Sequence, residues 1–245
     1  MAIKAILFDM GNTLINFEAE PARTLHRRAE DAVRDRLIAL GNGRVPPPDA
    51  FREQFARAWE VVGDRHRPDT GQPTLAEAIL VVLDALGIRI PPADLAALEE
   101  AHYGVIRAQI RPYPEAEGVL ARLRARGLGL ALISNTIWPT ALHRQDLAAL
   151  GWDRVFDPVV FSRDFGRMKP HPSIFRVALD RLGLAPEEAV VVGDRVEADV
   201  RGARNTGCRC VLKLHPYTRP EDPDAAGADG IIERLDELIG WLDRS

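Results

Sequence analysis

The chain has 245 residues, of which 46% are hydrophobic and 28% charged, and it carries a formal net charge of −4. This composition is typical of a soluble globular protein, and no apolar run approaches the length of a membrane span. The acidic balance argues against nucleic-acid binding, which needs a basic surface to neutralise phosphates. The opening residues lack the pattern of a secretion signal, so we expect a cytoplasmic protein. Cys208 and Cys210 lie two residues apart without further metal-ligand spacing, which predicts reduced packing residues and no zinc site.

The first element in chain order is a short apolar run that predicts a buried strand over residues 3–8, ending at Asp9. A different texture follows from Phe17 to Gln109, where Ala, Leu, Glu and Arg recur with helical periodicity and no strand pattern intervenes. Pro and Gly punctuate the breaks between helices. The predicted helices of this block cover residues 22–40, 50–62, 74–87 and 93–109.

After residue 112 short apolar strands alternate with amphipathic helices. Such alternation indicates a mostly parallel sheet with helices on both faces. The first strand belongs to that sheet, so the helical block is an insertion. We therefore expect an α/β core domain of residues 1–15 and 113–245 and a helical domain of residues 16–112. The predicted strands are 128–135, 154–162, 189–194, 208–214 and 229–232, and the predicted helices are 115–126, 139–150, 171–183, 196–206 and 233–243.

Polar residues follow several of these strands. In a parallel sheet the carboxyl ends of the strands meet at one edge, so residues far apart in sequence converge there. Together they offer a carboxylate nucleophile, hydroxyl and amide donors, one cation and an acidic cluster able to hold a hard divalent ion such as Mg²⁺. The residues concerned are Asp9, Ser134, Asn135, Lys169, Asp194 and Asp199.

Three of these positions have structural alternatives. Lys169 precedes a proline and is alternatively a surface lysine of a loop. Ser134 is alternatively a cap for the helix that follows. Asp199 lies within a predicted helix, where it is alternatively the ion-pair partner of Arg195 or Arg201.

The order of these motifs, "FDMGNTL", "LISN", "GRMKPHPSIF" and "VVVGDRVEAD", with a helical insertion in the first gap, resembles the haloacid dehalogenase-like superfamily. The resemblance covers nearly the whole chain and points to the branch whose helical cap follows the first motif. It implies a Rossmann-like parallel sheet core with an inserted all-helical cap domain. It also implies a hydrolase, a phosphoric monoester phosphatase, in which Asp9 attacks phosphorus and forms an aspartyl-phosphate.

The same resemblance implies how the other residues act. Mg²⁺ would be held by Asp9, the backbone carbonyl of Gly11 and Asp194. Asp199 belongs to this acidic cluster, where it either binds the metal or orients Lys169. Lys169 adds a second positive charge beside the transferred phosphate. The residues assigned to substrate binding are Asn12, Ser134, Asn135 and Lys169, and the tolerance of Asn for left-handed backbone also suits Asn12 to the turn itself.

Gly11 departs from the family pattern, because phosphatases of this superfamily usually carry a second Asp there as acid and base. Two alternatives to a phosphatase therefore remain: another hydrolase of the family, of dehalogenase or phosphonatase type, or a binding protein with reduced catalysis. The acidic pair Asp194 and Asp199 favours the phosphatase, since displacing halide from carbon needs no metal. We expect a small phosphorylated metabolite as substrate and a monomer or homodimer.

Overall fold

The computed structural model describes residues 2–17, 22–66, 71–221 and 226–244, which divide into two compact units. One, here called the α/β unit, contains residues 1–16, 111–135 and 147–245. The other, the helical unit, contains residues 17–110 and 136–146. The domain limits expected from the sequence stay a prediction beside this division, which assigns the segment 136–146 to the helical unit.

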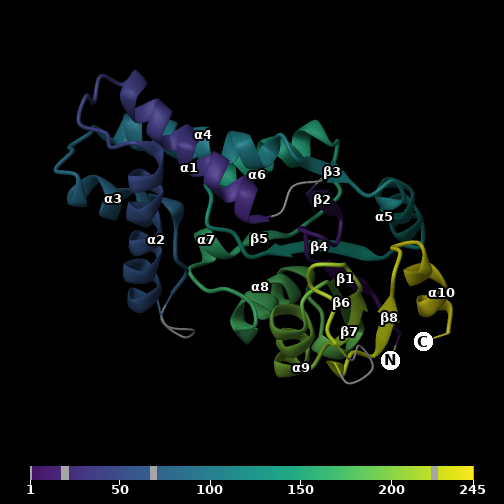
Figure 1. The fold of residues 1–245 in the computed structure, drawn as a ribbon. Coiled ribbons are helices and arrows are strands. Elements are labelled where there is room, and N and C mark those ends of the chain that lie inside the picture. The colour runs from purple at the N-terminus through teal and green to yellow at the C-terminus, as the bar shows by residue number, and fades with distance from the viewer. Residues whose placement is uncertain (1, 18–21, 67–70, 222–225, 245) are drawn as a thin grey trace. The chain divides into compact units, whose positions relative to one another are not determined.

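A six-stranded parallel sheet forms the centre of the α/β unit, which confirms the predicted fold class (Figure 1). The strand that precedes Asp9 lies in the middle and pairs on both sides with strands more than a hundred residues away in sequence. The strands, in their order across the sheet, are β5 (Val159–Phe161), β4 (Gly129–Ser134), β1 (Ala5–Phe8), β6 (Ala189–Gly193), β7 (Arg209–Lys213) and β8 (Gly230–Ile232).

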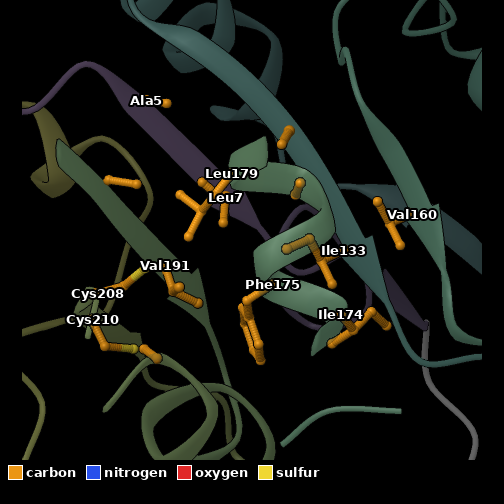
Figure 2. Packing of buried hydrophobic residues seen from close by; sticks show 14 of the residues in the cluster. Ala5, Leu7, Ile133, Val160, Ile174, Phe175, Leu179, Val191, Cys208 and Cys210 are labelled. Carbon is orange, nitrogen blue, oxygen red and sulfur yellow. The ribbon is translucent and has the colours of Figure 1, made fainter. Parts of the chain in front are cut away.

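Alternate side chains of the central strands point to opposite faces of this sheet, and both sets are buried. On one face Leu7 and Val191 pack against Phe175 and Leu179 of the helix α8, as Figure 2 shows. Cys208 and Cys210 belong to the same apolar cluster and are free, as the sequence predicts. In the described part of the chain after residue 112, the α-helices are α5 (Ala116–Ala125), α6 (Thr140–Ala149), α7 (Ser162–Phe165), α8 (Pro172–Leu182), α9 (Arg201–Thr206) and α10 (Glu237–Asp243), with a 3₁₀ turn at Pro186–Glu188.

The strand predicted over 3–8 begins only at Ala5, and the helix predicted over 233–243 begins only at Glu237. Two further predicted elements differ more from the structure. The strand predicted over 154–162 is only β5, because Trp152 and Val155 form a turn and Pro158 has no N–H for a strand ladder. The helix predicted over 196–206 consists of a π-helical turn, Val196–Val200, followed by α9.

In the helical unit the described part of residues 17–110 forms four helices, as the sequence predicts, and the segment 136–146 adds most of α6. Pro48 and Pro92 occupy first turns, where a missing N–H costs nothing, and Thr74 with Glu77 forms a capping box. The helices are α1 (Ala22–Ala39), α2 (Pro48–Arg65), α3 (Leu75–Ala85) and α4 (Pro92–Arg107). A two-stranded sheet of β2 (Ile15–Phe17) and β3 (Ile110–Pro112), not expected from the sequence, flanks this block in the chain. None of the helices in the described residues combines the length and apolar character needed to cross a bilayer.

Candidate active site

Asp9 stands directly after the central strand β1, and its backbone N–H donates to the carbonyl of Val192 in β6 at 2.8 Å. Its side chain is nearly buried. The Oδ1 atom accepts a hydrogen bond from Lys169 Nζ at 2.6 Å, and Oδ2 accepts one from the Thr13 hydroxyl at 3.2 Å. The carboxylate is therefore held by two donors at the carboxyl edge of the sheet.

Lys169 is only 3% exposed, which excludes the alternative of a surface lysine. Besides Asp9, its ammonium donates to Asp199 Oδ1 at 2.7 Å. The amide of Asn135 holds the backbone of Lys169 from both sides, accepting from its N–H at 2.8 Å and donating to its carbonyl at 3.0 Å. Lys169 is thus fixed through its backbone as well as through its charge.

Asp199 reaches this cation through the π-helical turn. The N–H groups of Asp199 and Val200 both donate to the carbonyl of Arg195, at 2.8 and 3.3 Å, which accommodates an extra residue in the turn. The Oδ2 atom of Asp199 accepts from the N–H of Arg195 at 3.1 Å. A side chain at Gly193 would collide with the Asp199 carboxylate, so the glycine at the end of β6 makes this approach possible.

The structure does not show Asp199 in an ion pair with Arg195 or Arg201, the alternative that the sequence left open. Arg195 contributes its backbone N–H to Asp199, and the guanidinium of Arg201 pairs with Glu197 at 2.9 Å. The carboxylate of Asp199 pairs with Lys169 instead.

Asp194, which follows β6, completes an acidic group with Asp9 and Asp199. One carboxylate oxygen from each lies within 4.8 Å of the others, and all three side chains are buried. Asn12 donates from Nδ2 to Asp194 Oδ2 at 3.3 Å. Its φ of 57° is left-handed, a conformation that Asn tolerates better than most residues, so the turn role expected for Asn12 is confirmed.

Burial shapes the protonation of this cluster. Burial raises the pKa of Asp9 to about 7, although the Lys169 ammonium opposes that rise. Burial and the neighbouring Asp199 charge raise the pKa of Asp194 as well. Burial lowers the pKa of Lys169, but the Asp199 and Asp9 carboxylates outweigh it, so the net pKa is raised and the lysine stays charged. The three carboxylates thus outnumber the Lys169 ammonium and the Lys213 ammonium that also acts on Asp194, which leaves an excess of negative charge in a buried place.

Gly11 and Ser134 lie at the same edge of the sheet. Ser134 is the last residue of β4 and is buried. Gly11 lies in the turn after Asp9 and forms an isolated bridge to Ile15. The catalytic, substrate-binding and metal-binding roles assigned from the sequence stay predictions, but all the residues concerned belong to one unit.

Three residues near Asp9 were not expected from the sequence. The Thr13 hydroxyl donates to Asp9, Lys213 at the end of β7 donates to the carbonyl of Asn12 at 3.1 Å, and the ring of Tyr113 lies under that lysine. The signal for Lys213 was a single charged residue within the apolar run "CVLKL", since a lysine in a buried strand needs a specific partner.

Comparisons with known proteins agree with this geometry. The family model described as "haloacid dehalogenase-like hydrolase" matches residues 3–207. A glyceraldehyde 3-phosphate phosphatase of Methanopyrus kandleri is 32% identical over 97% of this chain and 96% of its own length. A phosphoserine phosphatase of Thermus thermophilus is 47% identical, but the match spans 46% of this chain and 45% of that protein. Among solved structures, a HAD phosphatase from Thermococcus onnurineus has a TM-score of 0.68 and 28% identity, covering 98% of both chains.

Proposed function

Because the chain belongs to the haloacid dehalogenase-like hydrolase family, we propose that it is a Mg²⁺-dependent phosphatase that cleaves small phosphorylated metabolites through an aspartyl-phosphate on Asp9. The observation that carries this proposal is the buried ammonium of Lys169, which donates to both Asp9 and Asp199 beside a third carboxylate. A fixed cation next to a carboxylate nucleophile is what attack on an anionic phosphate requires. The full-length relative and the structural neighbour, both named as phosphatases, support the same class.

The acidic group fits a hard divalent cation. Its donors are carboxylate oxygens, which Mg²⁺ prefers, and the three buried carboxylates exceed the two nearby ammonium groups in charge. Asp9, the carbonyl of Gly11 and Asp194 would hold the ion. When bound, Mg²⁺ supplies positive charge that lets an anionic phosphate approach a carboxylate.

Asp199 has a different task in this proposal. Each of its carboxylate oxygens accepts a hydrogen bond within the protein, one from Lys169 Nζ and one from the N–H of Arg195. This pairing favours orientation of Lys169 over metal binding, the choice that the sequence leaves open. The amide of Asn135 has a parallel task, since both of its atoms hold the Lys169 backbone.

In the first step an oxygen of Asp9 attacks phosphorus, and the bond from phosphorus to the ester oxygen breaks. The electron pair stays on the departing oxygen, which takes a proton from water. In the second step a water oxygen attacks phosphorus and gives its proton to solvent, which neutralises the hydroxide left by the first step, while the bond to Asp9 breaks and the carboxylate is restored. Lys169 stabilises the charge on the transferred group in both steps, and Ser134 donates to its oxygens.

The test is phosphate release from p-nitrophenyl phosphate and from a panel of sugar, acyl and alkyl phosphates, with and without Mg²⁺. We expect Mg²⁺-dependent turnover that Asp9→Asn abolishes. Asp153→Asn is the matched control, because that aspartate is exposed on the surface of the same unit. Wild-type activity in Asp9→Asn would show that the covalent route is wrong.

A second assay separates this proposal from the dehalogenase alternative. We expect no halide from 2-haloacids, because the acidic pair Asp194 and Asp199 suits metal-assisted phosphoryl transfer and has no task in displacing halide from carbon. Steady halide release without added metal would replace the phosphatase proposal by the dehalogenase one. If neither assay shows turnover and metabolites only raise the melting temperature, the binding-protein alternative applies.

A further inference from the structure

Lys213 is a buried lysine that the mechanism above does not use. It is the last residue of β7, and the whole residue is 2% exposed. Its Nζ atom donates to the carbonyl of Asn12 at 3.1 Å and lies 3.7 Å from the centre of the Tyr113 ring. Lys213, Asn12 and Tyr113 all belong to the α/β unit.

Around Lys213 and Tyr113 there are more hydrogen-bond donors than acceptors. An ammonium group carries three N–H donors, and among the described residues only the Asn12 carbonyl accepts from Lys213. The Tyr113 hydroxyl is also buried and has no hydrogen-bond partner within the described part of the chain. The Lys213 ammonium also lies over the Tyr113 ring and in the field of the Glu115 and Asp194 carboxylates, but among the described residues neither carboxylate accepts a hydrogen bond from it. Buried donors without acceptors are unfavourable, which indicates that a ligand supplies the missing acceptors. Lys213 is a cation that can only donate, so an anionic group is the acceptor that binds it most strongly.

The Lys213 ammonium lies beside the turn that follows the nucleophile Asp9, and it is distinct from the Lys169 ammonium that contacts Asp9. β7 is the second strand from β1, with β6 between them, and neighbouring strands lie about 4.8 Å apart. The side chain of Lys213 reaches back to Asn12, whose own amide contacts Asp194. Lys169, in contrast, already donates to Asp9 and Asp199. The Lys213 ammonium thus lies beside the turn that carries Asp9, so the group that we place near it is the substituent next to a phosphate at Asp9.

We propose that Lys213, with the hydroxyl of Tyr113, binds a second anionic group of the substrate, a carboxylate or a further phosphate close to the ester that is cleaved. The inference rests on the proposed function for the ester itself. It narrows the substrate class to small phosphate monoesters with two anionic groups.

The test measures binding without turnover, by calorimetry on Asp9→Asn with Mg²⁺. The probes are phosphoglycolate, its neutral amide phosphoglycolamide, and inorganic phosphate. We expect phosphoglycolate to bind at least about tenfold more tightly than the amide, the effect of one charge-assisted hydrogen bond. In that background Lys213→Met should bring the two dissociation constants within about twofold of each other, and Tyr113→Phe should narrow the gap in part. Lys4→Met is the matched control, since Lys4 pairs with Glu188 with its side chain 60% exposed.

Equal binding of phosphoglycolate and its amide, or no binding of either, would overturn the inference. The inference would also be overturned if Lys213→Met weakened the binding of inorganic phosphate as much as the binding of phosphoglycolate. The lysine would then contact the phosphate that is transferred, not a second anionic group. If Lys213→Met does not fold, the two ligands and the Tyr113→Phe variant still decide the question. Failure of the phosphatase proposal is seen separately, as an absence of phosphate release by the wild-type protein.

Discussion

Gly11 is the residue that most affects the chemistry by what it lacks. A side-chain acid at this position protonates the leaving oxygen in the family pattern, and general acid catalysis of this kind contributes roughly 10² to 10⁴ in rate. Without it the leaving oxygen departs with more negative charge. We expect log kcat/KM to fall steeply as the pKa of the leaving alcohol rises, so that aryl and acyl phosphates are cleaved faster than primary alkyl phosphates.

The variant Gly11→Asp should flatten that dependence, because the new carboxyl group can protonate the departing oxygen. The measurement is a series of aryl and alkyl phosphates assayed with both proteins, at saturating Mg²⁺. A shallow slope in the wild-type protein would mean that another residue already acts as the acid.

Asp194 and Asp199 are both carboxylates of one cluster, yet the structure assigns them different partners. Asp199 contacts Lys169 and the Arg195 N–H, whereas the Asp194 carboxylate accepts from the side chain of Asn12. We therefore expect Asp199→Asn to lower kcat about 10- to 100-fold with little change in the Mg²⁺ concentration for half-maximal rate. Asp194→Asn should instead raise that Mg²⁺ concentration. The two titrations distinguish the roles, and a raised Mg²⁺ requirement in Asp199→Asn would make Asp199 a metal ligand.

At the scale of elements, the end of β6 and the π-helical turn depend on each other through Gly193. A methyl group there would meet the carboxylate of Asp199, which is fixed by Lys169. We expect Gly193→Ala to cost about 1–3 kcal/mol in the free energy of unfolding and to reduce kcat, because Asp199 must move. Denaturant unfolding and steady-state kinetics measure the two effects.

Gly118 provides the matched control for that substitution. It lies within α5, and a Cβ there would meet nothing within 4 Å. Gly118→Ala should stabilise the protein by about 0.5–1 kcal/mol and leave kcat unchanged. If Gly193→Ala kept full activity, the close approach of Asp199 to the strand would not matter for catalysis.

The elements that the sequence predicts well are the long or strongly patterned ones. α1 and α4 each run for several turns, so their periodicity is repeated, and β1, β4 and β6 are apolar runs closed by turn residues. The three-residue strands β2 and β3 offer no period to detect, and the bounds of β5 depend on a turn and a proline.

The residues of the candidate active site also differ in how far the sequence predicts them. Asp9 and Asp194 are polar residues just after apolar runs, a local signal that the sequence displays. The apolar run around Lys213 indicates only that this lysine needs a partner. The partners do not show in the sequence, because the turn at Asn12 and the Tyr113 ring come from distant segments. The pairing of Asp199 with Lys169 instead of an arginine likewise depends on the π-helical turn, which hydrophobic periodicity does not reveal.

At the scale of the whole molecule, one buried histidine makes stability depend on pH. His102 accepts a hydrogen bond at Nδ1 from Trp138 Nε1 at 3.1 Å, both within the helical unit. Burial, together with the nearby His26, lowers the pKa of His102 to about 3. The folded protein keeps this ring neutral, while the unfolded chain binds a proton below its ordinary pKa. The unfolded state thus gains protons as pH falls through 6.5, and the stability contributed by the neutral ring is lost progressively from there towards pH 3.

We expect this group to lower the free energy of unfolding by about 2 kcal/mol at pH 5 relative to pH 8. His102→Gln keeps an acceptor for Trp138 but does not titrate, so it should lose that part of the pH dependence. Denaturant unfolding of both proteins at the two pH values gives the change in the free energy of unfolding with pH for each. The contributions of the other groups cancel when the change in one protein is subtracted from the change in the other. The same pH dependence in both proteins would show that His102 is protonated in the folded state.

The central place of β1 also has a consequence for the order in which the protein assembles during synthesis. β1 pairs with β4 and β6, whose residues are translated more than a hundred positions later. At 5–20 residues per second, the roughly 126 residues between Phe8 and Ser134 take about 6–25 s to make. During that interval the nascent chain carries the apolar run "AILF" without its neighbours, while the helices encoded next already have all of their local contacts. The strand that positions the nucleophile therefore stays without its partner strands during this interval, and the active site can form only after the residues up to Asp199 have been made.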